Sequence, residues 1–422
     1  MLATVGARAR LSAPRLRRLP DLDLLPLLPP DVGPAFYWER PSRGIALLAL
    51  GSVAEVRPRG ARRLASVVRW WRRVLPAGLP PHLPVAVGGF AFQPRRARDD
   101  LWRPFGDALW WVPRLLLARL PQGSWAALFA ADEGGLEGLA EAPADGSSPP
   151  RPSPPAWDDD FRPAVAAALA RLQHGEAEKV VLARRLRLGW QRPCDPRTVL
   201  DRLRAAYPEC TVFALGRGGR WFLGATPETL LEMCDGRVRT DCLAGSAPRG
   251  RTPSEDEALA ARLLSDPKER QEHALVVAAV REALAPICRR LDLPPQPRVR
   301  RLANIQHLHT PVAGELARPL HLLQVAERLH PTPAVAGYPR GEALAIIQRL
   351  EGFDRGWYAG AVGWLDPRGG GELALAIRSA LVGRDGAVLY AGCGITAASD
   401  PWREEEESRL KLRAMLGALG VA

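Results

Sequence analysis

The stretch WYAGAVGWLDPRGGGELALAIRSALVGRDGAVLYAG, residues 357–392, contains three apolar runs separated by two turn segments. The runs Trp357–Leu365, Glu372–Val382 and Val388–Gly392 have the length and residue types of β-strands. The segments Pro367–Gly371 and Arg384–Gly386 contain glycine and are short enough to be hairpin turns. Three consecutive strands joined by hairpins predict an antiparallel sheet near the C-terminal end of the chain.

The rest of the chain also places strand-like runs in series. In the first 140 residues these runs lie at 44–56, 85–92, 108–120 and 124–131, and later ones lie at 179–188, 211–215, 221–223 and 237–243. Helices are expected at 61–75, 161–172, 254–264, 268–290 and 404–416. Because strands follow strands rather than alternate with helices, the order predicts an α+β fold and argues against a doubly wound one.

The composition is that of an ordinary globular protein. Of the 422 residues, 47% are hydrophobic and 25% charged, which excludes a wholly disordered chain. No run of about 18 apolar residues occurs, so no transmembrane helix and no membrane partner are expected. Prolines interrupt the leucine-rich N-terminus, which argues against a secretory signal, although a transit peptide stays an alternative. The six cysteines lack C-x-x-C spacing and are expected as reduced thiols in a cytoplasmic protein.

The net charge of +12 raises nucleic-acid binding as an alternative function. The arginines are scattered in pairs, without a basic stripe and interleaved aromatic residues, so we expect no nucleic-acid partner. Lysine is rare: only Lys179, Lys268 and Lys411 occur, and the other 55 of the 58 basic residues are arginine. A lysine amine can lose its proton, whereas an arginine side chain cannot. A retained lysine is therefore a candidate for chemistry, although we interpret Lys268, at a polar helix start, as chance retention.

Two pairs of glutamates predict a cation site. Glu269 and Glu272 lie three residues apart on one expected helix, and Glu404 and Glu407 repeat that spacing on the last helix. If the pairs meet across a cleft, their oxygen atoms suit Mg²⁺. The same pattern is typical of a solvated helix face, so this alternative stays open. Zinc at His307 and His309 is disfavoured, because no cysteine or third histidine lies nearby in the sequence.

Eight motifs resemble the chorismate-utilising enzymes in order and spacing over about residues 157–416. They are KVVLARR (179–185), ATPETLLE (225–232), LAGSAPRG (243–250), SDPKERQEH (265–273), HPTPAVAGYPR (330–340), DRGWYAGAVGW (354–364), IRSA (377–380) and AGCGI (391–395). The family includes isochorismate synthases, salicylate synthases and the large subunits of anthranilate and aminodeoxychorismate synthases. FYWERPSRG (36–44) also resembles isochorismate synthases of salicylate pathways. The resemblance implies two stacked antiparallel β-sheets with flanking helices and chorismate as the small-molecule substrate.

The resemblance also implies an organisation of the chain. Residues 1–156 are expected to form the N-terminal part of the sheet scaffold. They end in a loop rich in proline and serine at 143–155. Residues 157–422 are expected to form the chorismate-binding catalytic region, and both parts to belong to one structural unit.

Site residues follow from the matched motifs. Glu272 and Glu407 match Mg²⁺ ligands, with Glu269 and Glu404 as partners that act through water or through the ligands. Arg378 and Lys411 match residues that hold the substrate's carboxylates. Further contacts with the substrate are implied for Gly245, Ser246, His307 and Tyr358, and for the backbone amides around Gly392 and Gly394, which we expect in a turn. The helix reads QEHALV where relatives often have HEHELV, but the metal glutamate is kept.

Lys179 and Glu228 indicate the reaction. Lys179 matches the base that activates water in isochorismate and salicylate synthases, and Glu228 matches the general acid. Ala244 stands where aminodeoxychorismate synthases carry a nucleophilic lysine. We therefore predict a Mg²⁺-dependent isochorismate synthase, an isomerase in which water attacks C2 of chorismate and the C4 hydroxyl departs.

Two related activities remain as alternatives. A salicylate synthase uses the same residues and then eliminates pyruvate, but HPTPAVAGYPR resembles the isochorismate-only enzymes more. An anthranilate-type subunit needs a glutaminase partner and an N-terminal amino-acid site, and the sequence indicates neither. We expect a monomer without a glutaminase subunit. The sequence leaves open whether the product enters menaquinone or salicylate and siderophore synthesis.

Overall fold

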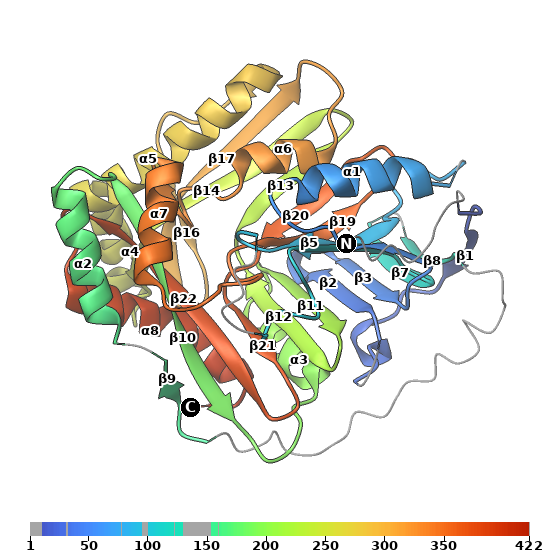
Figure 1. The fold of residues 1–422 in the computed structure, drawn as a ribbon, viewed down its shortest axis with the longest axis horizontal. Helices are drawn as coiled ribbons and strands as arrows, with labels where there is room; N and C mark the ends of the chain where they lie inside the picture. The colour runs from blue at the N-terminus through green and yellow to red at the C-terminus, as the bar shows by residue number, and fades with distance from the viewer. Residues whose placement is uncertain are drawn as a thin grey trace.

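The structure is a computed structural model that describes residues 11–30, 33–76, 78–94, 100–121, 123–129, 153–158 and 160–421. Two large antiparallel β-sheets pack against each other, and helices surround them (Figure 1). Within these residues, no helix is both long and apolar enough to cross a membrane. The α+β fold with two stacked antiparallel sheets is therefore confirmed.

The larger sheet contains twelve of the described strands. Their order across the sheet is β1 (Arg15–Leu19), β8 (Gly123–Leu128), β7 (Leu115–Leu120), β3 (Ile45–Leu50), β2 (Ala35–Arg40), β11 (Thr211–Arg217), β12 (Arg220–Thr226), β21 (Ser379–Val382), β22 (Gly386–Thr396), β10 (Lys179–Gly189) and β18 (Gly337–Tyr338), with β9 (Ala156–Trp157) paired to β10. The long antiparallel pair of β10 and β22 carries the motifs KVVLARR and AGCGI.

The smaller sheet contains ten described strands. Their order is β15 (Cys288–Asp292), β17 (Ile305–Leu316), β14 (Arg237–Pro248), β13 (Thr229–Cys234), β20 (Gly371–Leu375), β19 (Ala361–Leu365), β5 (Ala86–Phe90), β6 (Ala108–Val112) and β4 (Ala54–Val56), with β16 (Arg298–Arg301) paired to β17. Strands from both sides of residue 157 pair directly, as β2 does with β11 and β5 with β19. The two parts share both sheets, and the division into an N-terminal scaffold and a catalytic region at residue 157 stays a prediction.

Eight α-helices are described. They are α1 (Arg63–Val74), α2 (Phe161–Gln173), α3 (Pro196–Ala206), α4 (Pro253–Ser265), α5 (Pro267–Leu284), α6 (Leu322–Leu329), α7 (Arg340–Leu350) and α8 (Pro401–Ala418). Helix α8 packs on β22 and α5 packs on β14. Both begin with the same signal, an aspartate cap followed by proline at the first helical position, in which Asp266 and Asp400 accept hydrogen bonds from backbone amides. These caps fix the start of the two helices that carry the glutamate pairs.

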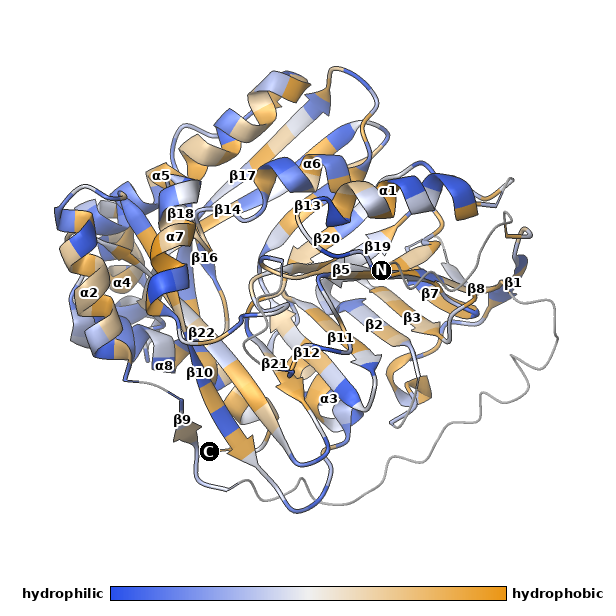
Figure 2. Cartoon of the chain, in the orientation of Figure 1, coloured by the Kyte–Doolittle hydropathy of each residue, from blue (hydrophilic) through white to orange (hydrophobic). Residues whose placement is uncertain are grey.

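Large aromatic side chains fill the space between the sheets, and Figure 2 shows apolar residues concentrated on the strands. Trp102 packs edge-on against Phe222 and donates a hydrogen bond from Nε1 to the Tyr390 hydroxyl at 3.2 Å. Tyr390 in turn stacks on Tyr358, with ring centroids 5.1 Å apart. Gly356 has a φ of +56°, and a Cβ there would lie 2.1 Å from the Trp102 ring. The aromatic core therefore continues up to Tyr358, which faces the site.

Three segments predicted as single strands are each two strands in different sheets. Segment 44–56 divides into β3 and β4, segment 108–120 into β7 and β6, and segment 372–382 into β20 and β21. At the last break Arg378 has a φ of +52°, in the left-handed region. The apolar pattern continues across each break because both halves bury side chains, so periodicity does not reveal where the chain crosses between sheets. The two predicted hairpins are confirmed by pairing of β19 with β20 and β21 with β22.

One helix prediction is wrong at its end. The expected helix 268–290 ends at Leu284, and a short 3₁₀ segment containing Pro286 leads into β15. Proline lacks the amide hydrogen that a helix interior requires, which explains the early end. Helices α3, α6 and α7 were not expected from the sequence. Of the predicted loop 143–155, only residues 153–155 are described, and they form no regular structure.

Candidate active site

A pocket lies between the two sheets and the helices α5 and α8, and it gathers residues from distant parts of the sequence. Its lining includes eleven of the fourteen predicted site residues: Glu228, Gly245, Ser246, Glu272, His307, Tyr358, Arg378, Gly392, Gly394, Glu407 and Lys411. The remaining three lie directly behind this lining. Glu269 and Glu404 line a neighbouring hollow between α4, α5 and α8, and Lys179 is buried behind Glu272.

Lys179 is 1% exposed at the start of β10, and its Nζ lies 2.9 Å from Oε1 of Glu272 on α5. Gly394 on β22 makes room for this ion pair. A Cβ at Gly394 would lie 2.3 Å from Glu272 Oε1 and 2.9 Å from Lys179 Cε. The pairing of β10 with β22 brings Gly394 near Lys179, because Gly394 is opposite Val181, two residues further along β10. A glycine at position 394 therefore leaves the space that the Lys179–Glu272 ion pair occupies.

Gly392 and Gly394 do not lie in the turn that the sequence analysis expected. Both belong to the regular strand β22, opposite Ala183 and Val181 of β10. The two glycines of the AGCGI motif suggested a turn. In the structure they are regular strand residues paired with β10. Lys411 Nζ donates to the carbonyl oxygen of Gly392 at 2.9 Å. The group that Gly392 presents to Lys411 is therefore an acceptor.

Gly245 shapes the opposite wall. It has a φ of +77° and lies at an irregularity of β14, where the register with β17 shifts between Ala244 and Ser246. A Cβ there would lie 3.1 Å from Glu269 Oε2. The backbone amide of Ser246 donates to that same oxygen at 2.9 Å. A β-bulge of this kind re-aims the strand, and here it directs an amide toward the glutamates.

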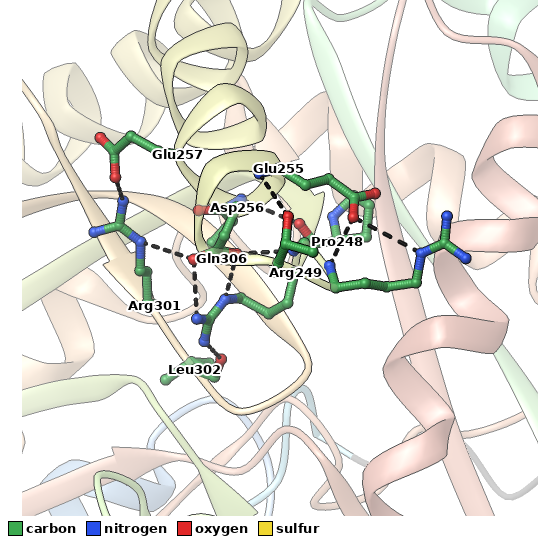
Figure 3. A network of polar contacts seen from close by, with 11 residues as sticks. Pro248, Arg249, Glu255, Asp256, Glu257, Arg301, Leu302 and Gln306 are labelled. Carbon is green, nitrogen blue, oxygen red and sulfur yellow. Dashed lines mark hydrogen bonds and ion pairs between the residues drawn. The ribbon is translucent and has the colours of Figure 1, made fainter.

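A network of polar contacts holds the segment after Ser246 (Figure 3). Arg249 binds Asp256 of α4 through two nitrogens, at 2.7 and 2.9 Å, and also donates to the Leu302 carbonyl. This guanidinium lowers the pKa of Asp256 to about 2. Gln306 Nε2 donates to the Pro248 carbonyl at 3.1 Å, which ties β14 to β17. The LAGSAPRG motif therefore positions Ser246 through contacts outside the pocket.

Three ion pairs neutralise the glutamate cluster, which we define as Glu269, Glu272, Glu404 and Glu407. Each lysine of the chain takes part in one: Lys179 with Glu272 at 2.9 Å, Lys268 with Glu404 at 2.9 Å, and Lys411 with Glu407 at 2.7 Å. The interpretation of Lys268 as chance retention does not account for this placement.

Burial and mutual repulsion still act on the glutamates of the cluster in the presence of the three lysines. Burial, together with the charges of Glu272 and Glu407, raises the pKa of Glu269 to about 7. Burial and the charge of Glu407 raise the pKa of Glu404. Burial opposes ionisation of Glu407 as well, but Lys411 outweighs it and holds the pKa of Glu407 below its usual range. Buried carboxylates that repel one another are hard oxygen donors, so these residues fit a divalent cation such as Mg²⁺.

In the described residues the four carboxylates do not converge tightly: no three of them bring oxygen atoms within 4.8 Å of one another. A three-ligand cluster by that measure is formed by His82, Cys234 and Asp235, which are exposed and lie outside the pocket lining. Asp235 there is already paired with Arg368. This exposed group therefore lies apart from the pocket and from the glutamate cluster.

Glu228 is buried on the pocket wall just after β12. Burial first, and then the negative charge of Asp241, raise the pKa of Glu228 to about 8. Asp241 is itself held by His309, whose Nε2 lies 2.8 Å away, and by Arg300 at 3.6 Å. A carboxyl group with this pKa is protonated at neutral pH and can donate a proton.

His307 and His309 have separate partners. His307 Nδ1 lies 3.1 Å from both the Ser246 hydroxyl and the Gly245 carbonyl, whereas His309 binds Asp241. No cluster of three metal ligands includes either histidine in the part of the chain that is described, so the zinc alternative finds no support. Burial and the charge of Arg378 lower the pKa of His307 to about 3, so its ring is neutral.

Arg355 lines the pocket but was not among the predicted site residues. It pairs with Glu351 and donates to the carbonyls of Val335 and Val181 at 2.7 and 2.6 Å. Glu351 also accepts a hydrogen bond from the Ala183 amide at 2.7 Å. The pair therefore joins β10 to the loop after α7. The motif DRGWYAGAVGW contains Arg355, but its sequence does not show that the guanidinium turns inward.

Two stacked antiparallel sheets that enclose this pocket agree with the fold that the motifs of the chorismate-utilising enzymes imply. A model of the family described as "Chorismate binding enzyme" matches residues 14–420. The chain belongs to this family of enzymes, as its motifs predict.

Relatives with established names are similar over most of their length. The salicylate biosynthesis isochorismate synthase of Pseudomonas aeruginosa is 36% identical over 411 residues, which are 92% of this chain and 85% of that protein. The isochorismate synthase MenF of Bacillus subtilis is 33% identical over 417 residues, 92% of this chain and 88% of that protein. The solved structure of MenF, the menaquinone-specific isochorismate synthase from Escherichia coli, has a TM-score of 0.81 at 27% identity and covers 98% of this chain and 96% of its own.

Proposed function

We propose that this enzyme is an isochorismate synthase that converts chorismate to isochorismate. The observation that carries the proposal is that one pocket is lined by a protonated acid, Glu228, and by Glu272, which is paired with the buried Lys179 directly behind it. The names of the two relatives described above support the same reaction. The cytoplasmic location and the monomeric state remain predictions from the sequence.

The chemistry requires an acid and a base on the substrate ring. Water adds at C2 while the double bond shifts and the C4 hydroxyl departs. Hydroxide is a poor leaving group, so Glu228 protonates the departing oxygen. Lys179 takes a proton from the attacking water and must be neutral to do so. Glu272, whose Oε1 lies 2.9 Å from the Lys179 Nζ, holds the amine in place beside the pocket.

The remaining pocket residues bind and orient the substrate. Arg378 and Lys411 would hold its carboxylates, and His307 and Tyr358 would border the ring. Glu272 and Glu407 would hold Mg²⁺, with Glu269 and Glu404 behind them. When bound there, Mg²⁺ would neutralise and orient the ring carboxylate of chorismate. Arg378 is kept in a left-handed conformation, a strain of about 1–3 kcal/mol that is typical of functional positions.

Product analysis tests the proposal. Incubation with chorismate and Mg²⁺ is expected to yield isochorismate, with no requirement for ammonia, because Ala244 offers no amine and Lys179 lies beside the pocket. Products are separated by liquid chromatography, with and without ammonium ions. Salicylate and pyruvate as the main products would establish the salicylate synthase alternative, and product formed only with ammonia would establish an anthranilate-type enzyme.

The pH dependence of turnover is expected to reflect Glu228. The acid must be protonated to act, so on the alkaline side of the profile kcat should fall as the pH rises through about 8. Glu228→Gln cannot donate a proton and should lower kcat by a factor on the order of 10²–10⁴. Both are measured at saturating chorismate and Mg²⁺. A kcat that stays constant to pH 9.5 or so in folded enzyme would exclude Glu228 as the acid.

A further inference from the structure

The three lysines of the chain share one environment, although only two of them have a role in the proposed function. In a chain with 58 basic residues, all three lysines pair with members of the glutamate cluster. Lys179 is the proposed base and Lys411 lines the pocket. Lys268 lies outside the pocket lining, and its Nζ forms ion pairs with the two glutamates behind that lining, Glu404 at 2.9 Å and Glu269 at 3.6 Å. Its placement therefore requires a separate explanation.

Lys268 reaches the cluster from the solvent side. Its side chain is 25% exposed, whereas the Glu404 side chain that it binds is 1% exposed. The hollow that contains Lys268, Glu269 and Glu404 shares Ser246 and Glu407 with the main pocket. The glutamate cluster thus separates the substrate pocket from a second opening, and the Lys268 ammonium lies in that opening.

We propose that Lys268 is a tethered counter-cation, whose ammonium group occupies the place between Glu404 and Glu269 until Mg²⁺ binds and then withdraws toward solvent. The proposal rests on the Mg²⁺ site of the proposed function. Four carboxylates and three ammonium groups nearly balance, which lets the cluster stay folded without metal. The positive charge of this ammonium also repels an incoming divalent cation, which must displace it from the carboxylates. Lys268 therefore weakens Mg²⁺ binding and stabilises the metal-free enzyme.

Lys268→Met tests this, because it removes the charge and keeps an unbranched side chain. Metal is first stripped with a chelator, and MgCl₂ is then titrated by calorimetry. The Kd for Mg²⁺ is expected to fall on the order of tenfold, since one neighbouring unit charge is lost. The Tm of the metal-free variant should be lower than that of the wild type, and Mg²⁺ should raise its Tm by more.

Two further variants serve as controls. Lys268→Arg keeps the charge and should bind Mg²⁺ with an affinity close to that of the wild type. Arg403→Met removes a positive charge from the same hollow, but within the described structure Arg403 forms no ion pair with the cluster. The Kd for Mg²⁺ and the Tm of this variant should therefore equal those of the wild type. If Lys268→Met does not fold without metal, Lys268→Gln replaces it, because its amide can still donate to Glu404 without a charge.

The outcomes separate this inference from the proposed function. Equal or weaker Mg²⁺ binding by Lys268→Met, in an enzyme whose wild type binds Mg²⁺, would overturn the inference and leave the function intact. Absence of Mg²⁺ binding in the wild type would overturn the metal site and the inference together. An equal effect in Arg403→Met would show that general surface charge, and not the Lys268 position, controls the affinity.

Discussion

Glu272→Gln and Glu407→Gln are each expected to abolish turnover without loss of the fold. Both side chains line the pocket, and each substitution removes one charge from a cation held by few protein ligands. Glu272→Gln also deprives Lys179 of its ion-pair partner. Turnover is measured from limiting to saturating Mg²⁺, with folding checked by circular dichroism and thermal denaturation. We expect a loss that added Mg²⁺ does not restore.

Glu406→Gln is the matched control for this pair. Glu406 lies on α8 next to Glu407, but its side chain is exposed and lines the neighbouring hollow between α4, α5 and α8, not the main pocket. The same change of charge on the same helix should therefore leave kcat nearly unchanged. Near-wild-type turnover of either Glu272→Gln or Glu407→Gln at limiting Mg²⁺ would show that the metal assignment is wrong.

Lys179→Arg is expected to be as inactive as Lys179→Ala, with kcat lowered by a factor on the order of 10²–10⁴. A guanidinium group keeps the charge but cannot accept a proton. Lys411 offers an internal contrast, because its assigned role is a fixed charge near a carboxylate. Lys411→Arg should keep measurable turnover, with weaker substrate binding because a planar fork replaces a point charge.

The comparison uses kcat for the three variants at saturating Mg²⁺. Lys179 is fully enclosed, and its Cε lies 2.9 Å from the position of a Cβ at Gly394, so folding of Lys179→Arg must be verified by circular dichroism. Substantial turnover of Lys179→Arg would mean that the side chain acts as a charge. The proposed base would then have to be abandoned.

Much of the fold could be predicted because local patterns and tertiary structure agree. The hairpins around 367–371 and 384–386 form as expected, since their turn residues and flanking apolar runs specify the same pairing. The breaks inside 44–56, 108–120 and 372–382 could not be predicted. Each depends on which sheet the second half joins, and that is decided by strands far away in the sequence.

The candidate site shows the same limit. Motif matching found Glu228, Arg378 and the glutamate pairs, because each keeps a distinct local sequence. Arg355 was missed, since its inward direction depends on Glu351 and on the Val181 carbonyl of β10. The place of Gly392 and Gly394 in a strand follows from the β10–β22 register, which short motifs do not reveal.

The rare lysines show what composition can and cannot provide. Counting alone marked three positions, and the structure places all three on one cluster. The sequence offered no reason to distinguish Lys268 from a surface residue, because Glu404, its partner, lies 136 positions away. Contact between α5 and the start of α8 exists only in the folded chain.

In the proposed reaction, water from solvent adds to C2 of chorismate as the C4 hydroxyl departs. The most direct test is turnover of unlabelled chorismate with Mg²⁺ in water enriched in oxygen-18, followed by mass spectrometry of the isolated product. We predict isochorismate that carries one heavy oxygen, located at C2. Isochorismate without label, or a product other than isochorismate, would contradict the account.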